Sequence, residues 1–166
     1  KPSVLMVTFG MNDSGYFEYN GDKPKEFGEQ KYQESIKNYQ QMEKRFKDLP
    51  DTRIVMVGTS PYDETVQLKE NTPFKTKNET IKRLVEYQKE SAAKNNWEFT
   101  DLNAPMVALN QQYQQKDPTF TLCGSDRIHP DNDGHMVMAY LFLKAQGFVG
   151  KEVADMEINA NKKQAV

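Results

Sequence analysis

The sequence predicts an α/β domain built on an open parallel sheet with helices on both faces. Three short apolar runs, 3–9, 53–58 and 97–102, alternate along the chain with segments of helical periodicity. The first two runs are apolar without alternation, which is typical of strands buried on both faces of a parallel sheet. Right-handed crossovers between such strands would place helices on either side of the sheet.

Four segments have apolar residues at a spacing of three to four and are predicted to be helices. The segments are 29–49, 79–95, 103–115 and 131–146. Asn78 is expected to cap the second of these helices, and Pro105 suits the first turn of the third. The expected apolar face of the last consists of Met136, Val137, Ala139, Tyr140, Leu141 and Leu143. One domain is expected over residues 1–150, followed by a polar tail over 151–166 that frays.

Composition sets limits on function. A chain of 166 residues can bury one core, and its formal net charge of −2 provides no broad basic field for nucleic acid or a membrane surface. No apolar run approaches the ~20 residues of a membrane-spanning helix. The single cysteine, Cys123, excludes an internal disulfide. Glycine-rich nucleotide-binding motifs are absent from the sequence.

The polar residues that follow the strands are expected to share one rim of the sheet. They lie at Gly10–Asp13, Thr59–Pro61 and Asp101–Asn103, and ligands of open α/β sheets bind beyond the carboxyl ends of the strands. The loop that carries Asp126 and His129 precedes the last helix, so we expect it to fold onto the same rim.

Asp126 and His129 place a carboxylate three residues before an imidazole. A general base needs one ring nitrogen free and the other held by a carboxylate, and this spacing allows that contact within one turn. The alternative is that Asp126 caps a turn and His129 is an ordinary surface histidine, which is the more common arrangement for this spacing.

For other candidate catalytic residues, a purely structural role is the alternative to a catalytic one. Asn12 could donate its amide to an oxyanion or form an Asx turn. Cys123 could be a nucleophile, although its flanks favour a buried thiol. No serine lies in a Gly-x-Ser-x-Gly elbow. His129 and His135 lack cysteine or glutamate partners at metal-ligand spacing. Asp131, Asp133 and Gly134 are faintly similar to a calcium loop, but no glutamate stands at its twelfth position, so no metal site is expected.

Two segments together resemble the SGNH/GDSL esterase and lipase family. Residues 7–13 (VTFGMND) are similar to its Gly-x-Asn-Asp block, and residues 125–130 (SDRIHP) to its Asp-x-x-His-Pro block. The resemblance implies a flavodoxin-like three-layer α/β/α hydrolase that cleaves small acyl esters, such as carbohydrate acetyl esters, through an acyl-serine, without metal or cofactor. It implies that His129 is the general base, Asp126 its orienting acid and Asn12 an oxyanion donor, while Gly10 and Asp13 shape the loop against the substrate.

The family's Gly-Asp-Ser nucleophile block has no counterpart in these residues. The resemblance therefore predicts a carboxyl-terminal part of a larger hydrolase that lacks its first strands and is inactive alone. The strand at 4–9 would become an exposed apolar edge that self-associates or pairs with the amino-terminal segment. Export to the periplasm or outside the cell is favoured by the same resemblance.

A non-catalytic α/β binding module is the alternative function. The sequence upstream of Lys1 separates the two: a Gly-Asp-Ser segment within roughly a hundred residues, about half a domain, indicates the esterase. A start codon just before Lys1 would indicate the binding module.

Overall fold

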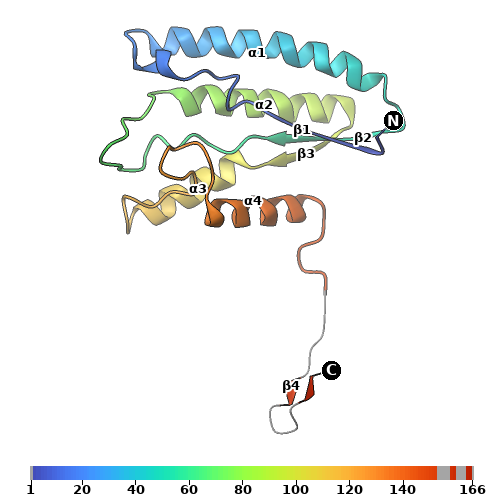
Figure 1. The fold of residues 1–166 in the computed structure, drawn as a ribbon. Coiled ribbons are helices and arrows are strands. Elements are labelled where there is room, and N and C mark those ends of the chain that lie inside the picture. Colours follow the sequence, from blue (N-terminus) through green and yellow to red (C-terminus); the bar gives the residue numbers. More distant parts are fainter. Residues whose placement is uncertain (1, 153–157, 160–163, 166) are drawn as a thin grey trace.

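The predicted α/β architecture is confirmed by the computed structural model, which describes residues 2–152, 158–159 and 164–165. The elements of the domain are β1 (Val4–Phe9), a 3-10 turn η1 (Phe17–Asn20), α1 (Pro24–Lys47), β2 (Arg53–Gly58), α2 (Lys77–Asn95), β3 (Glu98–Asp101), α3 (Asn103–Gln114) and α4 (Asn132–Ala145). The three strands pair in parallel in the order β1-β2-β3. Helices α1 and α2 cover one face of this sheet, and α3 and α4 cover the other (Figure 1).

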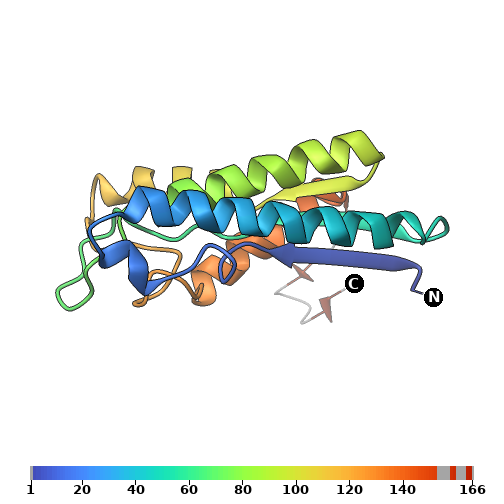
Figure 2. The same ribbon diagram turned by 90° about the horizontal axis from the view of Figure 1, so that it is seen from above.

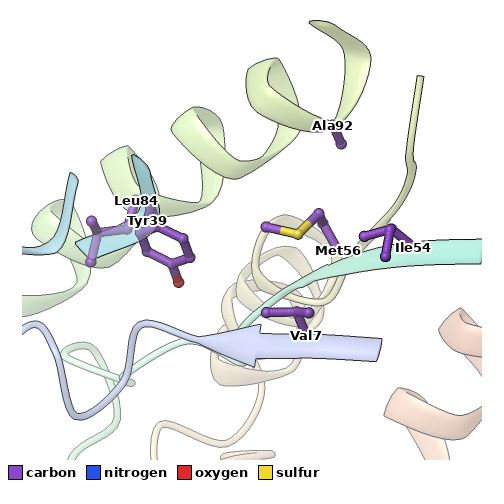
Figure 3. Packing of buried hydrophobic residues seen from close by; sticks show 6 residues of the cluster. All are labelled: Val7, Tyr39, Ile54, Met56, Leu84 and Ala92. Carbon is purple, nitrogen blue, oxygen red and sulfur yellow. The ribbon is translucent and has the colours of Figure 1, made fainter. Parts of the chain in front are cut away.

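The core between the sheet and α1/α2 follows the predicted helical stripes. Leu84 and Ala92 of α2 are fully buried and belong to one core cluster with Tyr39 of α1. Figure 3 shows Leu84 beside Tyr39 and Ala92 farther along α2, with Met56 of β2 and Val7 of β1 in the same cluster. The alternation of β2 sends Ile54 and Met56 to this core, whereas Val55 and Val57 face a second core beneath α3 and α4.

Part of the predicted apolar face of α4 was wrong. Val137 and Leu141 pack on the second core, as predicted, but they do so with Met138 and Phe142. Ala139 is exposed instead, and so are the large side chains of Met136, Tyr140 and Leu143, of which Met136 keeps 72% of its surface accessible. These three residues recur at i, i+4 and i+7, so α4 has a second apolar stripe that faces away from the core.

The first helix begins at Pro24, five residues before the predicted start. Pro24 occupies the first turn, where its missing N–H costs nothing. Gly28, just before the predicted start, lies inside the helix where α1 approaches α2 closely. A Cβ on Gly28 would lie 2.5 Å from the Thr80 hydroxyl oxygen, so only glycine fits.

The predicted cap of α2 by Asn78 was also wrong. The helix begins at Lys77, and the carboxylate of Glu64 accepts hydrogen bonds from the backbone N–H groups of Thr76 at 3.0 Å and Asn78 at 2.5 Å. The cap therefore comes from a residue distant in sequence. The Asn78 side chain instead accepts a hydrogen bond from the Tyr62 N–H at 3.2 Å.

Strand β1 is an edge strand of the sheet (Figure 2). The predicted burial of this strand on both faces was therefore wrong. Val7 is buried in the core beneath α1, but Val4 and Met6 remain 43% and 53% exposed. Met6 pairs in register with Val55, so Val4 and Met6 face the α4 side of the sheet. The edge expected from the family resemblance is therefore present and apolar.

The tail prediction falls mostly outside the described residues. Residues 153–157, 160–163 and 166 lie outside them, and the described remainder pairs β4 (Ile158–Asn159) antiparallel to β5 (Gln164–Ala165). The domain boundary at residue 150 stays a prediction. Among the helices described here, none is long and apolar enough to cross a membrane.

Candidate active site

The turn at residues 126–129 brings the predicted acid and base into contact. Asp126 Oδ1 accepts hydrogen bonds from the backbone N–H groups of Ile128 and His129, each at 2.9 Å, and Asp126 Oδ2 lies 2.6 Å from His129 Nδ1. The carboxylate of Asp126 therefore closes the turn and also holds the imidazole ring. The contact at Nδ1 leaves Nε2 available for proton transfer.

The Asp126–His129 pair is open to solvent, and its carboxylate is ionised. The His129 side chain is 81% exposed and that of Asp126 is 49% exposed. Partial burial of Asp126 raises its pKa, but hydrogen bonds from the His129 ring and from the two backbone N–H groups outweigh this and lower the pKa below its usual value. The carboxylate therefore stays ionised at neutral pH and can stabilise a positive charge on the imidazole.

Arg127, between the acid and the base, anchors the turn to the loop that follows β2. Its guanidinium is 1% exposed and donates to the carbonyl oxygens of Asp63 at 3.0 Å, Val66 at 2.8 Å and Asn71 at 2.5 Å. The backbone of Arg127 has a φ of +68°, and its side chain points inward while those of Asp126 and His129 stay open to solvent. The role of Arg127 was not predicted from the sequence, because the motif does not show which of its side chains is buried.

Replacing Arg127 by methionine should lower the free energy of unfolding by about 3 kcal/mol or more, because three buried carbonyl oxygens would lose their donor. Urea unfolding followed by circular dichroism measures this loss. Arg83→Met is the control, since the Arg83 guanidinium pairs with Glu29 on the surface and should matter far less. Equal losses in the two variants would contradict the anchoring role.

The Asn12 loop follows β1 and is closed by Asp13. Gly10 has a φ of +137°, and its N–H donates to Asp13 Oδ2 at 2.9 Å. The side chain that fixes this turn is therefore the Asp13 carboxylate and not the Asn12 amide. Asn12 is exposed, and its Oδ1 accepts a hydrogen bond from the hydroxyl of Tyr16.

Two observations place the Asn12 loop and the His129 turn at the same rim. Met11 and Ile128 pack against one core cluster formed by Tyr62, Ile81 and Val85. Phe74 packs against the same cluster, and its ring contacts the ring of Tyr16 in the Asn12 loop edge to face. The structure therefore brings Gly10, Asn12, Asp13, Asp126 and His129 to one end of the sheet, as the strand order predicted.

Lys77 is a second buried cation that the sequence analysis missed. It is fully buried at the start of α2, and its Nζ donates to the Met11 carbonyl at 3.0 Å, the Ser14 hydroxyl at 2.7 Å and the Gly15 carbonyl. Burial lowers the pKa of Lys77 to about 7, against the opposing charge of Glu64. Nothing in a polar stretch such as KTKNET distinguishes the one lysine that is buried.

We expect the stability of the protein to depend on pH through Lys77. Below about pH 7 the folded and unfolded chains both bind the Lys77 proton, and between pH 7 and about 10 only the unfolded chain keeps it. The wild type should therefore gain roughly 1 kcal/mol per pH unit over Lys77→Met in this range. Glu64, Tyr16, Tyr19 and Tyr62 surround Lys77. They remain in both proteins. Urea unfolding at several pH values measures the difference, and a constant difference would contradict the titration.

In the described residues, neither the Cys123 thiol nor a serine hydroxyl is hydrogen-bonded to the His129 ring. Cys123 is buried, its Sγ lies 3.2 Å from the Pro61 carbonyl oxygen, and burial raises its pKa to about 12. Within residues 2–152, no serine hydroxyl is hydrogen-bonded to the His129 ring. The described part of the chain also contains no cluster of three histidine, cysteine or acidic side chains that could hold a metal ion.

Solved structures with the same fold include several enzymes. The gut microbial diltiazem-metabolizing enzyme BT4096 is 84% identical over 99% of this chain, with a TM-score of 0.90. Axe2, an acetylxylan esterase from Geobacillus stearothermophilus, is 23% identical over 93% of this chain, with a TM-score of 0.63. LAE5, an alpha/beta hydrolase from the metagenome of Lake Arreo, is 17% identical over 91% of it, with a TM-score of 0.56. This chain spans 37%, 64% and 62% of the three proteins, respectively.

Sequence comparison gives the family. A search of curated proteins found no match. The model of the GDSL-like lipase/acylhydrolase family matches residues 1–137, which include both motifs identified above. Because this match covers most of the 166 residues, the chain belongs to the GDSL-like lipase/acylhydrolase family.

Proposed function

We propose that this chain carries the histidine–aspartate half of a serine ester hydrolase site, and that the nucleophilic serine belongs to a longer protein. The observation that carries the proposal is the 2.6 Å contact between Asp126 Oδ2 and His129 Nδ1 beside an open imidazole. The open ring and the short span of this chain within the 84% identical enzyme both support an incomplete site.

In the proposed reaction, His129 Nε2 takes the proton of the serine hydroxyl as the oxygen attacks the ester carbonyl. The Asn12 amide donates to the oxyanion that forms, and Asp126 stabilises the imidazolium. His129 then protonates the departing alcohol, which leaves an acyl-serine. A water molecule, deprotonated by His129, attacks this ester and releases the acid. Gly10 and Asp13 hold the Asn12 loop beside the substrate.

We propose small acyl esters as substrates. Acetylated xylo-oligosaccharides and diltiazem are the two to test first, because similar folds act on acetylxylan and metabolise diltiazem. Nitrophenyl acetate serves as the general probe. The aromatic side chains of Tyr16 and Phe17, which pack edge to face on Phe74, border the same loop and could contact a sugar ring.

Acyl-enzyme mapping tests this proposal. The full-length protein is mixed with nitrophenyl acetate, quenched in acid and digested, and the acetylated peptide is identified by mass spectrometry. We expect the acetyl group on a serine outside these 166 residues. Acetylation of a serine within them would overturn the proposed division of the site.

We further propose that the amino-terminal segment of the longer protein pairs with β1. The unpaired edge of β1, the exposed Val4 and Met6, and the outer stripe of α4 lie on the same side of the sheet. Such an apolar surface beside an open edge fits an added strand with a covering layer.

The isolated 166-residue chain should therefore self-associate through β1 in size-exclusion chromatography coupled to light scattering. Met6→Lys places a charge on the exposed edge and should shift the population towards monomer, whereas Lys94→Glu on α2 is the matched surface control. A wild-type chain that elutes as a stable monomer at all concentrations would contradict the expectation.

A further inference from the structure

The side-chain amide of Asn12 can stabilise an oxyanion only if its NH₂ group, and not its oxygen, faces the substrate. Asn12 is exposed on its loop, so its own burial does not fix this choice. An unrestrained amide would turn over between two orientations, and one of these would repel the oxyanion. The orientation of Asn12 therefore needs a partner.

Tyr16 is that partner in the structure. Its hydroxyl donates to Asn12 Oδ1, which leaves the two N–H donors of Asn12 on the opposite side of the amide. Burial and the carboxylates of Asp126 and Asp13 raise the pKa of Tyr16, so it keeps its proton and remains a donor.

The Tyr16 ring is itself fixed by contacts with Lys77 and Phe74. Its ring centroid lies 3.9 Å from Lys77 Nζ, and its edge packs on Phe74 with ring centroids 6.3 Å apart. The same Lys77 Nζ donates to the Met11 carbonyl, one residue before Asn12. The backbone of the Asn12 loop and the ring that orients the Asn12 amide are thus fixed to one buried group.

We infer that Tyr16, seated on Lys77, is a positioning residue that directs the Asn12 amide donors toward the reacting carbonyl. The inference rests on the proposed function, because only an oxyanion requires this orientation of the amide. Tyr16 does not touch the reacting atoms in this scheme. It acts through the oxygen of Asn12.

Nuclear magnetic resonance on the 166-residue chain tests the contact without any assay of activity. In the wild type we expect the ¹⁵N order parameter of the Asn12 side-chain amide to be about 0.8, and in Tyr16→Phe to fall below about 0.6. Tyr16→Phe keeps the ring on Lys77 and removes only the hydroxyl. Tyr113→Phe on α3, whose ring packs on Phe120, is the matched control and should change nothing. An unchanged order parameter in Tyr16→Phe would overturn the inference.

Kinetics of the full-length protein separates positioning from general support of the fold. Tyr16→Phe should lower kcat about 10-fold with KM unchanged, and Asn12→Ala should lower kcat about 100-fold. The double variant should be no slower than Asn12→Ala alone, because Tyr16 acts only through Asn12. Additive losses would contradict the inference. A full-length protein without any esterase activity would instead overturn the proposed function, while the order parameters would still decide the role of Tyr16.

Discussion

Replacing His129 by alanine should reduce ester hydrolysis by the full-length protein by about 10⁴-fold or more. The variant would have no base to accept the serine proton and no acid to protonate the departing alcohol. Its folding should change little, because the His129 side chain is largely exposed and the turn is closed by backbone contacts to Asp126. Steady-state hydrolysis of nitrophenyl acetate, with circular dichroism as a check of folding, measures the effect.

The chain supplies a matched control for this variant. His135 is the second histidine, is also exposed, and lies in the first turn of α4. His135→Ala should keep nearly full activity. Loss of activity in both variants would indicate damage to the fold, and full activity in His129→Ala would remove His129 from the proposed mechanism.

Asp126→Asn should lower kcat by about 10³- to 10⁴-fold. The asparagine oxygen can still accept from the backbone N–H groups of Ile128 and His129, so the turn should survive. Its NH₂ group would then face His129 Nδ1 and favour the tautomer whose proton is on Nε2. That tautomer cannot accept the serine proton, so the loss should appear in kcat.

Asp131→Asn is the control for the second prediction. Asp131 caps α4 by accepting a hydrogen bond from the Gly134 N–H at 3.3 Å, and asparagine caps helices about as well as aspartate. We expect normal activity and stability in this variant. A kcat that is equally low in Asp126→Asn and Asp131→Asn would show that the loss reflects the loop and not the histidine tautomer.

The sequence predicted the parts of the fold that depend on local pattern. The buried strand β2 and the stripe of α2 were predicted correctly, because continuous apolar runs and helical spacing leave few alternatives. The contact between Asp126 and His129 was also predictable, since it lies within four residues. The common rim followed from the order of strands and helices.

The features that were missed depend on contacts between distant segments. Glu64 caps α2 from the loop after β2, and Gly28 lies within α1 because Thr80 packs against it. Lys77 and Arg127 are buried cations whose partners are mostly carbonyl oxygens of other loops. Backbone acceptors leave no signature in the sequence, so these two anchors required the structure.

Hydrolysis of nitrophenyl acetate by the 166-residue chain and by the full-length protein tests the central claim most directly. We expect the full-length protein to turn over the ester and to lose that activity in His129→Ala. The 166-residue chain alone should be no faster than its own His129→Ala variant. Turnover by the 166-residue chain that disappears in His129→Ala would contradict the account, because the nucleophile would then lie within these residues.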